Sequence, residues 1–237
     1  MAGLTGRSLI ACDLRGHGQS TAQSDQYNVE LLGSDVGALL QTLNPRSTAV
    51  LIGHSLGCRV VLQAYLEAPN LVAGLVLVDG SWTPPGELAR ATQAVQDRMN
   101  SQGYAAFVRH IFEHMFLDNC DVALRQRIVD EALALPAFVG KPLFLHTMEW
   151  DALRMEAALA RVAVPLLILQ STVVIGDRAR VMLTSDESTP WLDLVRRRVP
   201  TADIRSITGV GHFSMLEASN RINEALEAFM HSLASSP

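Results

Sequence analysis

The fold of this chain is decided by residues 49–57, which read Ala49-Val50-Leu51-Ile52-Gly53-His54-Ser55-Leu56-Gly57. The apolar run 49–52 predicts a short buried strand, and the spacing of apolar residues over 57–68 predicts a helix directly after it. A serine between a strand and a helix stands on a sharp turn, where small residues are needed two positions to either side because the backbones crowd there. Gly53 and Gly57 occupy those positions.

This turn gives Ser55 the surroundings of a nucleophile. A serine hydroxyl attacks poorly unless it is held exposed and a neighbouring base removes its proton. The helix that begins here offers unpaired N–H groups, so the backbone N–H of Leu56 is a candidate donor to an oxyanion. The alternative is a structural turn in which the Ser55 hydroxyl only caps the helix.

Strand-like and helical segments alternate on both sides of this turn. Helix 190–198 has a good start, because Thr189 is a suitable N-cap and Pro190 suits the first helical position. Such alternation, with strands apolar enough to be buried on both faces, predicts an α/β fold: a mostly parallel sheet with helices on both faces. The predicted strands are 8–12, 49–52, 73–78, 165–169 and 202–207, and the predicted helices are 28–43, 57–68, 190–198 and 217–233.

Residues 85–161 interrupt the alternation with several helical stretches and no convincing strand, for example 104–116. We therefore divide the chain into a core, residues 1–82 and 162–237, and a helical lid, residues 83–161. Ligands of open α/β sheets bind beyond the carboxyl ends of the strands, and the lid is expected to cover those ends.

The candidate base is His212, in the segment Gly209-Val210-Gly211-His212-Phe213 that follows the last predicted strand. Glycines let a loop carry the imidazole from another strand end to the serine. A histidine near the C-terminus also fits the chain order serine, acid, histidine. The alternative is an ordinary histidine of a surface loop.

Three motifs in this order resemble the α/β-hydrolase superfamily. They are Asp13-Leu14-Arg15-Gly16-His17-Gly18-Gln19-Ser20, the turn at Ser55 and the loop at Gly211-His212. The resemblance covers nearly the whole chain outside the lid and implies a Ser-Asp-His triad. We interpret the first motif, residues 13–20, as a structural turn that closes a strand.

The resemblance leaves two candidates for the triad acid. Many relatives carry the acid a few residues after the strand equivalent to 165–169, but here the expected position holds no carboxylate and the nearest is Asp177. Asp79 ends the predicted strand 73–78 beside that of Ser55, and some family members, haloalkane dehalogenases among them, place their acid there. We favour Asp79 and keep Asp177 as the alternative acid. Asp79 could instead only cap its strand end, and Asp177 could belong to a simple surface loop.

The family also leads us to expect two or three strands, and a His-Gly loop with a second oxyanion donor, before the strand at 8–12. This sequence begins after that point, so we expect the Leu56 donor alone. The absence of one donor typically costs about 100- to 1000-fold in rate. We also expect an exposed apolar sheet edge, which favours association.

The lid and its surroundings are rich in large apolar side chains, of which we expect two or three to touch a substrate. For the pocket we predict Trp82, Trp150 and Phe213, and an uncharged acyl or aromatic group as the ligand. The apolar side chains of residues 82–150 considered for this role are Trp82, Phe107, Phe112, Met115, Phe116, Phe138, Phe144, Met148 and Trp150.

Composition excludes several other classes of protein. The net charge of −5 is spread without a basic face, so nucleic acid is not an expected partner. The three cysteines, Cys12, Cys58 and Cys120, lie far apart, which fits neither a disulfide framework nor a metal site. We expect no metal or cofactor, no membrane span, no secretory signal and a cytoplasmic location. Nothing in the sequence predicts an oligomeric state.

The sequence therefore predicts a serine hydrolase acting on a carboxylic ester, lactone or related acyl compound, a small-molecule substrate. One alternative is a cofactor-independent ring-cleaving dioxygenase, which resembles the same fold and carries its acid at the position of Asp79. The other is a non-catalytic member that only binds a ligand.

Overall fold

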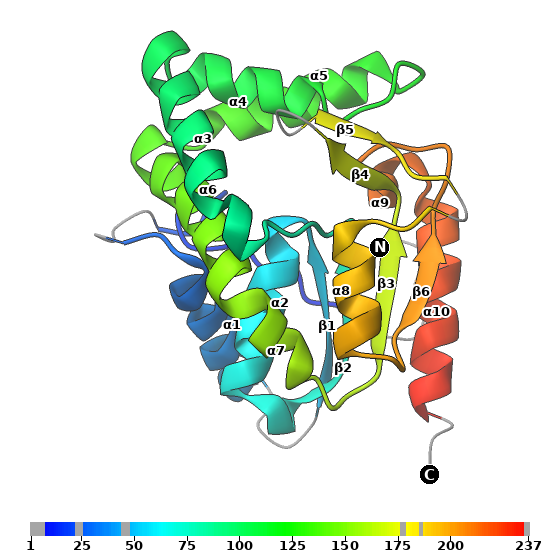
Figure 1. The fold of residues 1–237 in the computed structure, drawn as a ribbon. Coiled ribbons are helices and arrows are strands. Elements are labelled where there is room, and N and C mark those ends of the chain that lie inside the picture. The colour runs from blue at the N-terminus through cyan, green and yellow to red at the C-terminus, as the bar shows by residue number, and fades with distance from the viewer. Residues whose placement is uncertain (1–7, 22–25, 44–47, 176–178, 185–186, 235–237) are drawn as a thin grey trace.

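A parallel sheet of four strands in the order β1-β2-β3-β6 forms the centre of the molecule (Figure 1). The structure is a computed structural model and describes residues 8–21, 26–43, 48–175, 179–184 and 187–234. The sheet confirms four of the predicted strands. Their bounds are Ala49–His54 for β1, Val72–Val78 for β2, Leu166–Gln170 for β3 and Asp203–Ser206 for β6.

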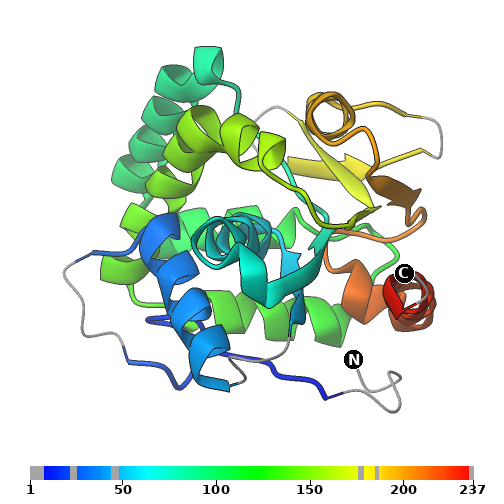
Figure 2. The same ribbon diagram turned by 90° about the horizontal axis from the view of Figure 1, so that it is seen from below.

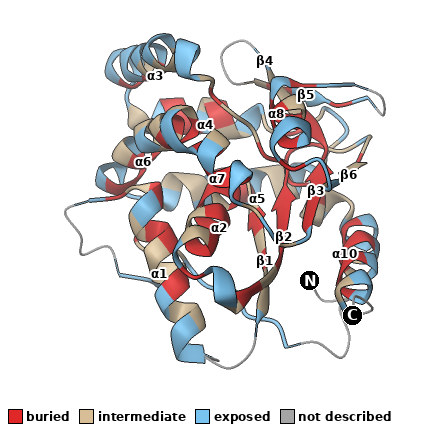
Figure 3. Ribbon diagram, turned by 60° about the horizontal axis from the view of Figure 1, so that its bottom comes forward, coloured by how far each residue is buried: buried red, intermediate tan, exposed pale blue. Residues whose placement is uncertain are grey.

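Both faces of the middle strands are buried, which is why β2 and β3 are apolar except for Gln170 at the end of β3 (Figure 3). Side chains alternate between the two faces along a strand. Leu75 and Leu77 of β2 therefore pack into one cluster with α2 and α8, whereas Val76 and Val78 pack into another with α10. The view along the strands shows α8 and α10 on opposite sides of the sheet (Figure 2).

The helices around the sheet largely follow the prediction. Thr189 caps α8 as expected, because its hydroxyl accepts a hydrogen bond of 3.1 Å from the N–H of Leu192. The predicted last helix is divided into α9 and α10. The bounds are Val29–Leu43 for α1, Leu56–Glu67 for α2, Pro69–Leu71 for the 3₁₀ turn η1, Pro190–Arg198 for α8, Ser214–Glu217 for α9 and Ser219–Ala234 for α10.

The segment predicted as a lid is helical, and α4 and α5 lie across the carboxyl ends of the strands (Figure 1). The last part of this segment packs against the sheet, since Met155, Ala158 and Leu159 belong to the hydrophobic cluster that contains Leu75 and Leu77 of β2. None of the helices in the described part of the chain has both the length and the apolar character needed to cross a bilayer. The bounds are Pro85–Glu87 for η2, Leu88–Gln102 for α3, Tyr104–Glu113 for α4, Val122–Ala134 for α5, Ala137–Trp150 for α6, Asp151–Met155 for the π-helix η3 and Glu156–Ala160 for α7.

The structure differs from the predicted strands in two segments: one predicted strand is absent, and one hairpin was not predicted. Residues 8–12 form no strand, and Leu9 and Ile10 are exposed. The described residues supply no neighbouring strand to hydrogen-bond with them, and an isolated strand is not stable in water. No strand is predicted between 169 and 190, but β4, Thr172–Ile175, pairs antiparallel with β5, Ala179–Met182. This hairpin stands beside α5 above the sheet (Figure 1).

Candidate active site

Ser55 stands on a strained turn between β1 and α2. Its φ of 53° and ψ of −113° lie in a region that residues other than glycine rarely adopt. The backbone N–H of Ser55 is held by a 3.0 Å hydrogen bond to the carbonyl of Val78. The side chain makes no capping hydrogen bond to α2, so it does not serve as the helix cap. Leu56 is the first residue of α2, where backbone N–H groups have no partner within the helix.

The two glycines around Ser55 are not equivalent. A Cβ on Gly53 would lie 2.2 Å from the carbonyl oxygen of Gly57, a distance that real side chains do not tolerate. A Cβ on Gly57 would meet nothing within 4 Å beyond its own helix. The expectation that both positions need a small residue is therefore correct for Gly53 and wrong for Gly57.

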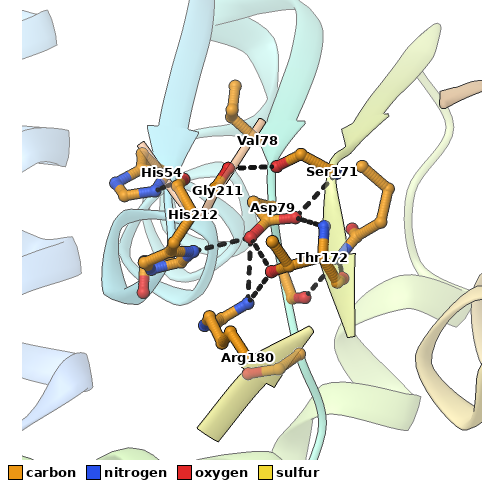
Figure 4. Close-up of polar contacts among 12 residues, drawn as sticks. His54, Val78, Asp79, Ser171, Thr172, Arg180, Gly211 and His212 are labelled. Atoms are coloured by element: carbon orange, nitrogen blue, oxygen red, sulfur yellow. Dashed lines mark hydrogen bonds and ion pairs between the residues drawn. The ribbon is translucent and has the colours of Figure 1, made fainter. Parts of the chain in front are cut away.

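His212 and Asp79 come together although they are 133 residues apart in the sequence. Asp79 follows β2, His212 lies in the loop after β6, and both strands end at the same edge of the sheet. The Nδ1 of His212 lies 2.6 Å from Oδ2 of Asp79, and both side chains are buried (Figure 4). Because a carboxylate only accepts, Nδ1 carries the proton, which leaves Nε2 with a free lone pair.

The Asp79 carboxylate accepts four further hydrogen bonds. Its Oδ1 accepts from the backbone N–H groups of Ser171 at 2.8 Å and Thr172 at 2.7 Å. Its Oδ2 accepts from the Thr172 hydroxyl at 2.5 Å and from Nη1 of Arg180 at 2.9 Å. Asp79 thus also ties the end of β2 to the end of β3, as the strand-capping alternative requires, but one of its oxygens points at His212. Its φ of 47° is a second strained value at this edge.

Hydrogen bonds from two sides hold the loop that carries His212. The Nε2 of His54 donates to the carbonyl of His212 at 2.9 Å, and the two imidazole rings lie 4.3 Å apart between centroids. From the other side the N–H of His212 donates to the carbonyl of Met115 at 2.8 Å. The side chain of His54 therefore supports the loop that carries His212.

Burial and charge set the protonation of these groups. Burial, the positive charge of Arg180 and the neighbouring His54 together lower the pKa of His212 well below its ordinary value, against the opposing effect of Asp79. Burial would raise the pKa of Asp79, but the hydrogen bond from His212 and the charge of Arg180 outweigh it and hold that pKa far below its ordinary value. Burial lowers the pKa of His54 to about 4. At neutral pH the arrangement is therefore a carboxylate beside a neutral imidazole.

A cavity of about 330 Å³ opens beside Ser55, between the strand ends and the lid helices. Phe213, predicted for the pocket, lines it together with Leu56 and Arg180. Three of the apolar residues considered for substrate contact also line it, namely Phe112, Met115 and Phe144. The described residues contain no cluster of three or more His, Cys, Asp or Glu side chains arranged to hold a metal ion.

Trp82 and Trp150, also predicted for the pocket, are not among the residues that line this cavity. Trp150 is buried in the main core, and its indole N–H donates to Gln63. The indole N–H of Trp82 donates to the carbonyl of Asp151. Both serve packing, because an indole ring that finds a hydrogen-bond partner in the core is well accommodated there. The alternative acid Asp177 lies outside the described residues.

Two arginines at this site were not predicted from the sequence. Arg180 reaches Asp79 from β5, and Arg59, one turn after Ser55, donates to the Ser55 carbonyl at 2.9 Å and forms a buried ion pair with Asp151. Thr172 was visible as a polar residue just beyond a predicted strand. No pattern in the sequence marks Arg180, since it belongs to none of the three motifs and to no predicted strand or helix.

Comparison with known proteins agrees with this architecture. A model of the alpha/beta hydrolase family matches residues 1–225. The chain belongs to the alpha/beta hydrolase family. The fold and the resemblance predicted from the three sequence motifs are confirmed.

Individual proteins are similar to parts of this chain. It is 38% identical over 92 residues to 2-(acetamidomethylene)succinate hydrolase of Mesorhizobium japonicum, an alignment that covers 39% of this chain and 32% of that protein. It is 41% identical over 75 residues to an sn-1-specific diacylglycerol lipase of Danio rerio, covering 32% of this chain and 23% of the lipase. The alignments thus span a third or less of these two relatives.

A solved structure extends the likeness to nearly the whole fold. A thermophilic esterase from Thermogutta terrifontis superposes with a TM-score of 0.74 at 18% identity, covering 93% of this chain and 78% of the esterase. At that identity the likeness establishes the shared fold alone.

Proposed function

We propose that this protein hydrolyses a carboxylic ester, lactone or related acyl compound through Ser55, His212 and Asp79. The observation that carries the proposal is the 2.6 Å contact between His212 Nδ1 and Asp79 Oδ2, at the same edge of the sheet as a serine on a strained strand-to-helix turn. The names of two relatives, a hydrolase and a lipase, support the same class of reaction.

In the first half of the reaction, Nε2 of His212 takes the hydroxyl proton of Ser55 while Oγ forms a bond to the carbonyl carbon of the substrate. The carbonyl π electrons move to oxygen, and the N–H of Leu56 stabilises this oxyanion. Asp79 keeps the imidazole in the correct tautomer and balances its new charge. When the oxyanion collapses, the bond to the alcohol breaks and His212 returns its proton to the departing oxygen.

In the second half, water replaces the alcohol. His212 removes one proton from the water as its oxygen attacks the acyl carbon of the acyl-enzyme. Collapse of this intermediate breaks the bond between the acyl carbon and Oγ, and the proton returns to Ser55. The products are the carboxylic acid and the regenerated enzyme.

The cavity supports an apolar acyl or aromatic group as the part of the substrate beside Ser55. Its walls include Val108, Ile111, Phe112, Leu143 and Phe144. A volume of about 330 Å³ lies at the small end of the range for ligand pockets, which favours a short or medium chain over a long one.

The test is covalent labelling with a fluorophosphonate, followed by peptide mapping, together with a series of p-nitrophenyl esters of increasing acyl length. We expect the label on Ser55 and release of p-nitrophenol from the shorter esters. The variant S55A is expected to lose both, with turnover reduced by about 10⁴-fold or more.

Two further variants complete the test. H212Q is expected to lose labelling because the hydroxyl keeps its proton, whereas the matched control S232A, in α10 and away from the site, should behave as the unchanged protein. A folded protein that binds the esters but neither reacts with the probe nor turns them over would contradict the proposal. It would favour a non-catalytic ligand-binding protein instead.

A further inference from the structure

One oxygen atom of the site is shared by three donors. Oδ2 of Asp79 accepts from His212 Nδ1 at 2.6 Å, from the Thr172 hydroxyl at 2.5 Å and from Arg180 Nη1 at 2.9 Å (Figure 4). His212 therefore shares this carboxylate oxygen with two other hydrogen-bond donors. A permanent positive charge is bound to the same atom.

Arg180 is fixed firmly in this position. The side chain of Arg180 is 5% exposed and that of Asp79 is 0% exposed. Nη1 also donates to the Thr172 hydroxyl at 2.9 Å, and the backbone N–H of Arg180 is bound to the carbonyl of His114. The hairpin β4–β5 thus places the guanidinium group of Arg180 against the Asp79 carboxylate. Arg180 also lines the cavity beside Ser55.

A fixed cation on this oxygen opposes a second one. When His212 takes a proton from Ser55, a new positive charge forms on the imidazole, and Asp79 must balance it. Asp79 already balances Arg180, and a like charge within a few ångströms disfavours the charged form of a neighbour. The low exposure of the three groups leaves little water to screen this repulsion.

We propose that Arg180 is a positioning residue that limits how readily His212 accepts a proton, by sharing with it the Oδ2 atom of Asp79. His212 then remains neutral, with Nε2 unprotonated, in mildly acidic solution. An ordinary histidine would be positively charged there and could not act as a base. This inference rests on the proposed role of His212 as the general base.

Other groups around His212 are accounted for. His54, at the end of β1, faces the His212 ring and is itself neutral because burial lowers its pKa to about 4. Cys58 of α2 lies near Asp79, and burial raises the pKa of its thiol to about 12, so it is also neutral. Glu217 of α9 accepts from the N–H of Gly211, and the segment after α4 contributes the Met115 carbonyl, which accepts from the N–H of His212. Arg180 is therefore the cation that is paired with the acid of the triad.

The first experiment follows the pH dependence of kcat/KM in R180Q and R180A. Removal of the cation is expected to shift the acidic limb upward by about one pH unit or more, so activity is lost first in acidic solution and is retained in alkaline solution. Arg180 lines the cavity, so millimolar guanidinium should enter the space left in R180A and move the limb back. R180K, which keeps the charge, is expected to shift less than R180Q. The control R205A removes an exposed arginine of β6, paired with Asp203, and should leave the limb in place.

The second experiment does not need turnover. In an S55A background, NMR titration of His212, assigned by comparison with H212Q, is expected to give a higher pKa when R180Q is added. The two hypotheses can therefore fail separately. A higher His212 pKa in the R180Q variant, together with no esterase activity in the protein that keeps Ser55, supports the role of Arg180 and counts against the proposed hydrolysis. An unchanged His212 titration in folded R180Q, or a lower kcat with the same pH profile, would overturn the inference.

Discussion

Gly53 and Gly57 lie at equal distances from Ser55 in the sequence, but their surroundings differ. The backbone of β1 passes so close to the first turn of α2 that a Cβ on Gly53 would overlap the Gly57 carbonyl group, 2.2 Å from its oxygen and 2.4 Å from its carbon. Neither atom belongs to a flexible side chain that could move away. Gly57 is an ordinary helical residue with open space in the Cβ direction. The geometry of the turn therefore depends on the first glycine only.

These two positions give a matched pair of variants. G53A is expected to lower the free energy of unfolding by about 3 kcal/mol or more, because the overlap can be relieved only by moving backbone. G57A is expected to raise it by about 0.5–1 kcal/mol, the usual gain of alanine over glycine within a helix. Urea denaturation followed by circular dichroism measures both. Equal destabilisation by the two substitutions would refute this account.

The site residues that were predictable from the sequence are those at strand ends. Ser55 and His212 stand among glycines directly after predicted strands, and Asp79 is the first residue after one, so topology brings all three to one edge of the sheet. Arg180 was not predictable in this way. Its contact with Asp79 depends on a hairpin whose pairing partners are identified only once the chain is folded. Trp82 and Trp150 were assigned to the pocket on residue type alone, which does not distinguish a pocket wall from a core.

At the level of elements, one buried ion pair joins the end of the lid to the turn at Ser55. Arg59 of α2 donates to both carboxylate oxygens of Asp151 in η3, each at 2.8 Å, and the two side chains are 2% and 1% exposed. The same guanidinium group binds the carbonyls of Ser55 and Ser81, and Asp151 also accepts from the N–H of Thr83. Two segments at strand ends are thus fastened to the π-helix.

Breaking this pair should destabilise the protein strongly. D151N leaves the buried charge of Arg59 uncompensated, and we expect a loss of about 3–5 kcal/mol in the free energy of unfolding. The matched control is E156Q, which breaks the exposed pair between Arg198 and Glu156 and should cost less than about 1 kcal/mol. Denaturant titration compares the two. A D151N protein as stable as E156Q would show that the buried pair contributes nothing.

The elements that the sequence predicted best are those whose pattern is set by burial on both faces. β2, and β3 up to Leu169, are continuous apolar runs because helices cover them on each side, and a run of this kind is visible without knowing its partners. Residues 8–12 have the same composition but no strand beside them in the described chain, so composition was insufficient there. The hairpin β4–β5 was not predicted for a different reason: its two short strands form a separate two-stranded sheet, and their sequences are not continuous apolar runs.

For the whole molecule, the two buried histidines at the strand ends link stability to pH. Burial is the first cause that lowers the pKa of both His54 and His212, the former to about 4. In the unfolded chain each would titrate near its ordinary pKa of about 6.5. Between the folded and unfolded pKa values the unfolded state binds more protons, so stability falls as the pH falls through this window. Asp79, whose pKa is lowered, loses its contribution only in much more acidic solution.

The unfolding free energy is therefore expected to be lower at about pH 5 than at about pH 7.5, by up to about 2 kcal/mol for each of these histidines. H54Q should reduce this difference by the share of one histidine, because glutamine does not titrate and its amide can still donate to the carbonyl of His212. H231Q, in the exposed part of α10, is the control and should leave the difference unchanged. Urea denaturation of the three proteins at both pH values measures the effect. Stability that is independent of pH over this range, or the same pH dependence in H54Q as in the unchanged protein, would contradict this account. It would mean that the folded protein binds these protons as readily as the unfolded chain does.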